Sequence, residues 1–183
     1  QHQHEALKES YLKQVSEHLK AEIESKKIEE ALYNKQLLLR TLIDIIPDCI
    51  YSKDTESRKT LANIADLKNT GAKSESEVIG KNDFEVYPKE LAERFYADDQ
   101  NILKTGNPVI NREEYVLGPM GNKRWLLSSK IPLRNQDGKI IGLVGVGRDI
   151  TDRKRAEDQL KQSKQHFQLL IESLPQHIYT KDL

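Results

Sequence analysis

Residue types that carry metal or redox chemistry are sparse in this sequence. It holds one cysteine, Cys49, which excludes an internal disulfide, a CxxC motif and a multi-cysteine zinc site. The histidines do not cluster with that cysteine along the chain; they are His2, His4, His18, His166 and His177. We therefore predict no metal site, and a single thiol agrees with a reducing compartment.

Motifs of phosphate and hydrolase chemistry are incomplete. Gly145-Val146-Gly147 has the start of a dinucleotide-binding loop, but Ile150 stands where the third glycine is required. We expect these glycines to thin one face of a sheet instead. The sequence contains no GxSxG, Walker A or HExxH motif, and it lacks the phosphoacceptor histidine and the ATP-binding boxes of a histidine kinase. These residues are therefore not expected to form an enzyme.

Charge and hydropathy restrict the partners. Lysine plus arginine total 29 and aspartate plus glutamate total 29, so no basic surface for nucleic acid is predicted. The longest nearly apolar run, Ile140 to Val146, has seven residues, whereas a membrane-spanning helix needs about twenty. Residues 1–30 contain no apolar core of a signal peptide. We expect a cytoplasmic segment without membrane contact, whether or not the parent protein is anchored elsewhere.

An internal repeat predicts a longer protein built from tandem modules. The segment 42–54 returns as 170–182, with seven of thirteen positions identical at an offset of 128 residues. A period of this length has the size of a domain. Because the chain starts at Gln1 and stops soon after the repeat begins, we expect a fragment in which residues 174–183 open a second, truncated copy.

A long helix is predicted before the middle region. Residues 5–39 contain neither proline nor glycine and are rich in Glu, Lys, Leu, Gln and Ala, which favours a helix. Its apolar stripe consists of Leu12, Val15, Leu19, Ile23, Ile28, Ala31, Leu32 and Leu39. We predict that residues 1–40 pair with their own copy as a coiled coil. The alternative is a single helix that lies on its own domain.

A second helix is predicted over residues 152–173, with Thr151 as its N-cap and Asp152 in its first turn. Its heptad seam has spacings of four and three and is formed by Ala156, Leu160, Ser163, Phe167, Leu170 and Leu174. Pro175 ends this helix. We expect a linker helix that pairs within a homodimer.

The region between these helices has the pattern of an α+β domain. Helical segments are predicted at 64–68, 76–79 and 89–105, the last ending at Gly106. Short strands are expected at 49–53 and 60–63, and longer ones at 109–117, 123–133 and 139–150. Turns at 118–122 and at Asp137-Gly138 join the last three strands. An antiparallel sheet covered by helices on one face is the economical assembly.

Residues 41–151 resemble a PAS domain, the sensory module of bacterial and archaeal histidine kinases and related signalling proteins. Short pieces in the family's order carry the resemblance: Ile46-Pro47, Ile50-Tyr51, Lys53-Asp54, Asn63, Val78-Ile79-Gly80-Lys81, Asp83-Phe84, Trp125, Pro132, Asp137-Gly138, Gly142 and Arg148-Asp149-Ile150-Thr151. It implies a five-stranded sheet in the order 2-1-5-4-3 that encloses a pocket with its helices. It also implies dimerisation through the flanking helices and signal coupling through Arg148, Asp149, Ile150 and Thr151.

The cofactors of known PAS domains fit this chain poorly. Haem-binding members use a histidine on or near the long helix of the domain, and no histidine lies within residues 41–151. Blue-light flavin members need a cysteine in a helical motif with asparagine and glutamine partners, whereas Cys49 falls on the predicted first strand. Trp125 occurs in redox-sensing flavin members, but a tryptophan there more often packs a helix against the sheet. We predict no cofactor; a small carboxylate or another polar metabolite is the alternative.

The resemblance also orients the side chains of the pocket. Setting Trp125 and Pro132 on the family's strand turns Leu126, Ser128 and Lys130 inward, because side chains alternate along a strand. On the two neighbouring strands, the same register turns these residues inward: Arg112, Glu114, Val116, Ile141, Leu143, Gly145 and Gly147. A buried lysine requires a partner. Either Lys130 pairs with Glu114 and no ligand binds, or a small polar ligand is held by Lys130, Glu114, Ser128 and Arg112.

These expectations define the functional hypotheses. The first is a sensory or relay PAS module of a two-component sensor histidine kinase, which couples a small-molecule or partner signal in the pocket to dimeric output helices. The second is a ligand-free dimerisation and spacer module. The third is a PAS module of a diguanylate cyclase.

Overall fold

A 44-residue helix precedes the sheet domain in this computed structural model, which describes residues 2–117 and 123–173. Helix α1 spans His2–Ile45 and thus ends at Ile45 rather than near Leu39, since no proline or glycine interrupts its hydrogen-bond ladder. Its apolar stripe is exposed; Leu19 and Ile23 are 51% and 54% accessible. Residues 1–46 and 47–183 form two separate units, and each is described by itself.

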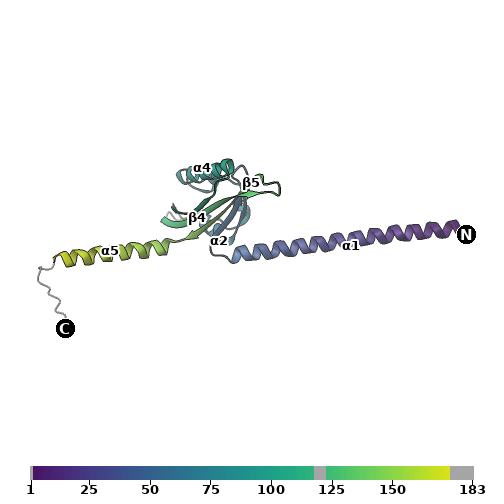
Figure 1. The fold of residues 1–183 in the computed structure, drawn as a ribbon, viewed down its shortest axis with the longest axis horizontal. Coiled ribbons are helices and arrows are strands. Elements are labelled where there is room, and N and C mark those ends of the chain that lie inside the picture. The colour runs from purple at the N-terminus through teal and green to yellow at the C-terminus, as the bar shows by residue number, and fades with distance from the viewer. Residues whose placement is uncertain (1, 118–122, 174–183) are drawn as a thin grey trace, which may run out of the picture. The chain divides into compact units, whose positions relative to one another are not determined.

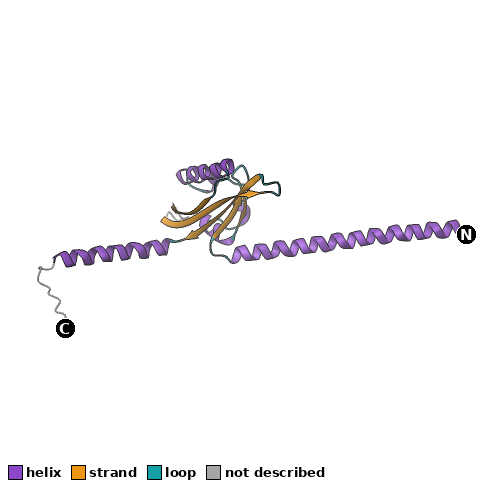
Figure 2. Ribbon diagram, in the orientation of Figure 1, coloured by secondary structure: helices purple, strands orange, loops and turns teal. Residues whose placement is uncertain are grey.

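Five antiparallel strands form one sheet in the order β2-β1-β5-β4-β3, which confirms the predicted α+β fold class and strand order (Figure 2). The strands are β1 (Cys49–Lys53), β2 (Lys59–Ala62), β3 (Val109–Leu117), β4 (Lys123–Arg134) and β5 (Ile140–Asp149). The last strand in the sequence lies in the centre, where it pairs with β1 and with β4. A movement of β5 therefore reaches both halves of the sheet.

Strand β3 is irregular near its start. Val109 pairs with Lys130 and Arg112 pairs with Ser128, so β3 advances three residues where β4 advances two. Asn111 has a φ of 50°, a left-handed conformation that asparagine tolerates better than most residues. The register of β3 on β4 therefore shifts by one residue between Val109 and Arg112.

Short helices and one long helix cover the sheet face that carries Tyr51 and Lys53. They are α2 (Ile64–Thr70), the 3-10 helix η1 (Glu75–Glu77), α3 (Asp83–Val86) and α4 (Lys89–Thr105). The side chain of Asn63 caps α2 by accepting a hydrogen bond from the Asp66 amide, and α4 ends at Gly106 with a φ of 72°. Helix α4 runs across the strands (Figure 1).

The apolar core of the domain is small, and many polar side chains are buried beside it. Leu91, Val116 and Leu126 form an apolar cluster against Tyr87 and Phe95. The buried polar residues are Lys53, Ser57, Lys59, Asn63, Asp66, Asn69, Asp83, Asp99, Glu114, Ser128 and Lys130. An unpaired buried charge costs several kcal/mol, so the charged members require partners inside the domain.

Helix α5 (Thr151–Ser173) follows β5 with one residue between them. Leu160, Phe167 and Leu170 of its predicted seam are at least half exposed. The predicted turn 118–122, the seam residue Leu174 and the predicted second copy at 174–183 lie outside the described residues. None of the helices within the described ranges is long and apolar enough to span a bilayer.

Candidate functional site

Three strands of the sheet each contribute one buried lysine, and three covering helices each contribute one buried aspartate. The lysines are Lys53 of β1, Lys59 of β2 and Lys130 of β4, and the aspartates are Asp66 of α2, Asp83 of α3 and Asp99 of α4. Each of these residues is at most 3% exposed. We call this set the lysine–aspartate cluster; with all its members ionised its charges cancel.

Lys53 and Lys130 share the carboxylate of Asp99. Nζ of Lys53 donates to both carboxylate oxygens of Asp83 at 2.7 and 2.6 Å and to Oδ2 of Asp99 at 2.5 Å. Nζ of Lys130 donates to Oδ1 of Asp99 at 2.7 Å and lies 5.1 Å from the ring centre of Phe95. Burial lowers the pKa of Lys53, but Asp99 and Asp83 outweigh it and hold this pKa above its ordinary value. Lys53 is therefore a cation at neutral pH.

The third pair of the cluster attaches α2. Nζ of Lys59 donates a hydrogen bond to Oδ2 of Asp66 and lies 5.0 Å from the ring centre of Tyr51. Asp66 and Asn69 are three residues apart, so they share one face of α2, and both are buried. The pocket side of α2 therefore docks through polar side chains.

The predicted Lys130–Glu114 pair is wrong. Glu114 accepts a hydrogen bond of 3.2 Å from Arg112 and lies 3.8 Å from Nη2 of Arg94. In the observed register Glu114 lies opposite Leu126, four residues along β4 from Lys130. Four strand positions span roughly 13 Å, which exceeds the reach of a cross-strand pair. Lys130 is neutralised by a helix residue instead.

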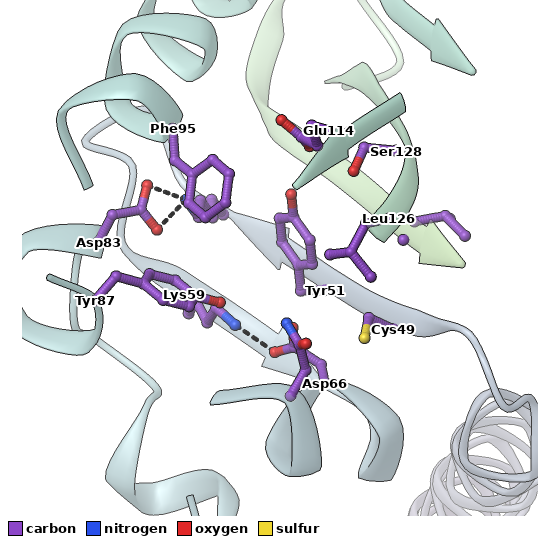
Figure 3. A pocket seen from close by; sticks show the side chains of 14 residues that line it. Cys49, Tyr51, Lys59, Asp66, Asp83, Tyr87, Phe95, Glu114, Leu126 and Ser128 are labelled. Carbon is purple, nitrogen blue, oxygen red and sulfur yellow. Dashed lines mark hydrogen bonds and ion pairs between the residues drawn. The ribbon is translucent and has the colours of Figure 1, made fainter. Parts of the chain in front are cut away.

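A cavity of about 30 Å³ remains beside the lysine–aspartate cluster. Its lining includes Tyr51, Asp66, Phe95, Glu114, Leu126 and Ser128 (Figure 3). The hydroxyl of Tyr51 points toward the side of the cavity where Glu114 and Ser128 lie (Figure 3). Tyr51 and Ser128 each bring a hydroxyl group to the lining of this cavity. A space of this size accommodates one or two water molecules, and these hydroxyls are the groups that would bind them.

The four predicted ligand residues fall into different surroundings. Glu114 and Ser128 line the cavity. Lys130 is 2% exposed and belongs to the lysine–aspartate cluster. Arg112 lies at the edge of the domain, where its Nη1 donates to Asp98 at 3.0 Å. The structure therefore brings Glu114 and Ser128 to one cavity and engages Arg112 and Lys130 in ion pairs.

Sequence reasoning identified only Lys130 of the cluster and missed its three aspartates, Lys53 and Lys59, although signals for some of them were present. Lys53 follows Cys49 and Tyr51 at the two-residue period of β1, so it shares their inward face. Asp99 lies four residues after Phe95 and three before Ile102, on the apolar face of α4. A charged residue at an apolar position of a predicted helix indicates a buried partner.

Two glycines of β5 face the pocket for different reasons. A Cβ at Gly145 would overlap the phenol ring of Tyr51, whereas a Cβ at Gly147 would have its nearest neighbours at 3.7 Å (Leu126) and 3.8 Å (Cys49). Of these two glycines, only Gly145 is required by a close approach. Ile141, predicted to face inward, is 44% exposed. It is the extra residue of a bulge, because Leu133 pairs with Gly142 and Arg134 with Ile140.

Cys49 and Tyr51, which also line the pocket, stay neutral at physiological pH. Burial, with a smaller contribution from Asp66, raises the pKa of Cys49 to about 12. Burial and then Asp99 raise the pKa of Tyr51 well above its ordinary value. Cys49 is therefore a thiol without nucleophilic character. Over residues 2–117 and 123–173, no group of histidine, cysteine, aspartate and glutamate side chains is arranged to hold a metal ion.

The residues predicted to couple the sheet to the exit helix lie at the β5–α5 junction. Oδ1 of Asp149 accepts a hydrogen bond of 2.9 Å from the amide of Thr151, the first residue of α5. The Thr151 hydroxyl accepts a hydrogen bond of 2.9 Å from the Trp125 amide of β4. Thr151 was predicted to cap α5, but its side chain binds the neighbouring strand and Asp149 caps the helix. Ile150 is buried, and its amide donates to the Trp125 carbonyl at 2.8 Å.

Ion pairs of Arg124 on β4 and Arg148 on β5 fix the same junction. Arg124 of β4 donates to Oδ2 of Asp149 through Nε at 3.0 Å and Nη2 at 2.6 Å. Burial raises the pKa of Asp149, but hydrogen bonds from Thr151 and the contacts of Arg124 outweigh it and hold this pKa below its usual value. Arg148 of β5 pairs with Asp48 at 2.9 Å.

The first turn of α5 also contacts β3. Glu113 accepts a hydrogen bond of 2.6 Å from Nη2 of Arg153 and forms an ion pair with Lys154. Nζ of Lys154 lies 5.4 Å from the ring centre of Trp125. The start of α5 is thus held by β3, β4 and β5.

Comparisons with known proteins agree with this geometry. Residues 43–155 match the family described as the PAS fold. The aerobic respiration control sensor protein ArcB of Escherichia coli is 29% identical over 142 residues, covering 78% of this chain and 18% of ArcB. The methanogenesis regulatory histidine kinase FilI of Methanothrix harundinacea is 32% identical over 133 residues, covering 70% of this chain and 15% of FilI. A diguanylate cyclase of Vibrio cholerae is 29% identical, covering 76% of this chain and 44% of that protein. The chain spans less than half the length of each relative.

Solved structures show the same likeness. VqmA of Vibrio cholerae, in a complex with ligand and DNA, is 30% identical with a TM-score of 0.58, covering 63% of this chain and 52% of that one. VqmA bound to DPO is 28% identical with a TM-score of 0.56, covering 62% and 57%. The PAS domain of Bordetella pertussis BvgS is 27% identical with a TM-score of 0.54, covering 73% of this chain and 98% of that domain. Because the family match extends over more than half of the chain and the sheet has the matching strand order, this chain belongs to the PAS family.

Proposed function

We propose that this chain is a sensory or relay module in which a change inside the PAS domain is passed to a paired α5. The observation that carries the proposal is the position of β5. This strand is central in the sheet, it borders the cavity at Gly147, and Ile150 alone separates its end from the start of α5. A shift of β5 therefore acts on the first turn of α5 without a loop to absorb it.

The parent protein is proposed to be a sensor histidine kinase. The sensor protein ArcB and the regulatory histidine kinase FilI support this assignment, and the diguanylate cyclase relative supports the alternative output. The matched PAS region is itself a non-catalytic domain, so the chemistry of either parent belongs to another part of the protein.

The flanking helices are proposed to form the dimer that receives the signal. Leu160, Phe167 and Leu170 repeat at spacings of seven and three on α5, and all three are at least half exposed. Burial of such a seam against a second copy removes apolar surface from water. The exposed stripe of α1 supports the same arrangement.

The pocket is proposed to prefer an uncharged polar ligand over the small carboxylate suggested by Lys130. VqmA, which was solved bound to DPO, supports small-molecule binding by a relative. In this chain each buried lysine already has an aspartate partner. A carboxylate ligand would therefore add a negative charge without an available cation, which burial opposes.

A ligand-free spacer module is the second candidate function. A cavity of about 30 Å³ and the complete internal pairing of the lysines favour it. Native mass spectrometry of the purified chain discriminates the two: a copurifying small molecule of defined mass supports sensing, and the bare chain mass, with no calorimetric response to uncharged metabolites, supports the spacer.

Spin labels on α5 test the relay in the full chain. With Cys49→Ser to remove the native thiol, a nitroxide at Gln165→Cys reports the distance between the two copies of α5. We expect a dimer in sedimentation, and we expect Asp149→Asn to change the interspin distance distribution while Asp158→Asn, on the exposed middle of α5, leaves it unchanged. A monomer, or identical distributions in all three proteins, would overturn the proposal.

Leu160→Glu together with Phe167→Glu should abolish the dimer without unfolding the domain.

A further inference from the structure

One arginine connects the helix that covers the pocket to the base of the output helix. Nη1 of Arg124 donates a hydrogen bond of 3.1 Å to Oδ1 of Asn69 on α2. The other two donor positions, Nε and Nη2, bind Oδ2 of Asp149 at 3.0 and 2.6 Å. The guanidinium group is planar and its donors are fixed relative to one another, so Asn69 and Asp149 are held at opposite sides of one rigid group.

The Asn69 end of this link belongs to an element that also enters the pocket. Asn69 is buried and borders the cavity, and Asp66, one turn earlier on the same face of α2, forms the ion pair with Lys59. Helix α2 has seven residues and is capped at both ends, by Asn63 and by Gly71. Because α2 is short and both of its ends are capped, we expect it to move as a rigid body. A displacement of Asp66 would then also displace Asn69.

The Asp149 end belongs to the first turn of α5. Its carboxylate divides its two oxygens between partners: Oδ2 binds Arg124, and Oδ1 accepts the Thr151 amide at 2.9 Å. A helix start favours a carboxylate because its first amides have no partners within the helix. The position of Arg124 thus influences how firmly Asp149 caps α5.

We propose that Asn69, Arg124 and Asp149 form a coupling link through which α2 sets the order of the first turn of α5. This inference rests on the proposed relay function and specifies its regulation: the Lys59–Asp66 pair is the input, and α2 is the element that moves. Arg124 and Asn69 are positioning residues in this scheme, since they act through Asp149. The contact of Glu113 with Arg153 and Lys154 holds the same turn from β3 but touches no part of α2, so it lies outside the link.

Hydrogen–deuterium exchange of the full chain tests the link. Asp66→Asn weakens the input pair, and the readout is the exchange rate of the amides at 152–155, in the first turn of α5. With Asn69 intact we expect Asp66→Asn to change these rates by about three- to tenfold. In an Asn69→Ala background the same substitution should change them less than about twofold. Equal changes in both backgrounds overturn the proposal, because the effect of Asp66 then bypasses Asn69; no change in either background overturns it as well.

Matched variants distinguish an effect that passes through the coupling link from a general destabilisation of the domain. Asp98→Asn breaks the ion pair with Arg112 on α4 and β3, and its effect at 152–155 should be the same with and without Asn69. Lys59→Gln is the second input variant, used if circular dichroism shows that Asp66→Asn is unfolded. The exchange readout needs no second copy of the chain. If Asp66→Asn changes the exchange rates through Asn69 but the chain is a monomer, the proposed relay is refuted and the coupling link is retained. If the chain is a dimer whose α5 responds to Asp149→Asn, but the effect of Asp66→Asn does not depend on Asn69, only the coupling link is refuted.

Discussion

Asp99 of α4 accepts a 2.7 Å hydrogen bond from the ammonium group of Lys130 of β4, and both residues are at most 2% exposed. The second oxygen of the same carboxylate binds Lys53. One helix residue therefore neutralises two lysines of the sheet. The docking of α4 on the sheet thus depends on this carboxylate as well as on the apolar contacts of Leu91 and Phe95.

Substitution of Asp99 by asparagine should destabilise the domain strongly. The change leaves Lys130 without an anionic partner and removes one of two partners of Lys53, and breaking a buried ion pair on one side costs about 3–5 kcal/mol. Urea denaturation followed by circular dichroism gives the free energy of unfolding. Asp98→Asn on the same helix is the control: its pair with Arg112 is partly solvated, so its loss should cost about 1 kcal/mol or less. Equal losses for the two variants would show that the buried pairing does not determine stability.

Alanine should be tolerated at Gly147 and not at Gly145. A Cβ at 145 overlaps the ring of Tyr51, whereas one at 147 makes ordinary contacts at 3.7 and 3.8 Å. We expect Gly145→Ala to lower the free energy of unfolding by about 1–3 kcal/mol and Gly147→Ala to change it by less than about 1 kcal/mol. Tyr51→Leu should recover part of the loss at Gly145→Ala, since it removes the ring that the new methyl group meets. Thermal melts of the four proteins check this order.

The stabilising effect of Asp149 should disappear in acid. Its folded-state pKa lies below the ordinary value of 3.8, so its contribution is fully present above that value and is lost as the pH falls through the lowered pKa. The difference in unfolding free energy between the wild type and Asp149→Asn should therefore be larger at pH 7 than at pH 3. Urea titrations at the two pH values measure it. A difference that stays constant or grows in acid would contradict the assigned hydrogen bonds.

Cys49 should be nearly inert in the folded chain. Its pKa of about 12 and its exposure of 7% leave almost no thiolate at pH 8. Relative to an ordinary cysteine, this shift alone reduces the thiolate fraction about a thousandfold. Iodoacetamide labelling followed by mass spectrometry should be slow in buffer and fast in denaturing urea. Rapid labelling of the native chain would mean that the first strand opens readily.

The sequence predicted the sheet well because its signals are local. The three strands after residue 108, the helix 89–105 and the inward face of Ser128 and Lys130 follow from alternation, turn residues and the family's order of motifs. These features depend on neighbours within a few positions. The resemblance to PAS domains then supplied the strand order, which local patterns do not contain.

The partners in the pocket were harder to predict because they depend on register and on docking. Glu114 lies opposite Leu126, four positions along β4 from Lys130, and side-chain alternation alone does not determine which residues of two strands lie opposite each other. Asp99 is 31 residues before Lys130, so their pairing requires the placement of α4 on the sheet. Arg124 and Asn69 are 55 residues apart and were missed for the same reason.

The distances along the chain between the buried charges also bear on how the domain assembles. Lys53 lies 30 residues from Asp83 and 46 from Asp99, and contacts of such separation form late because the entropy cost of closing these loops must be met first. Until α3 and α4 dock on the sheet, the lysines on that face remain hydrated. A partly folded domain therefore exposes ammonium groups on a sheet face that an apolar core would make hydrophobic. Repulsion between the ammonium groups of two such chains disfavours their aggregation before folding is complete.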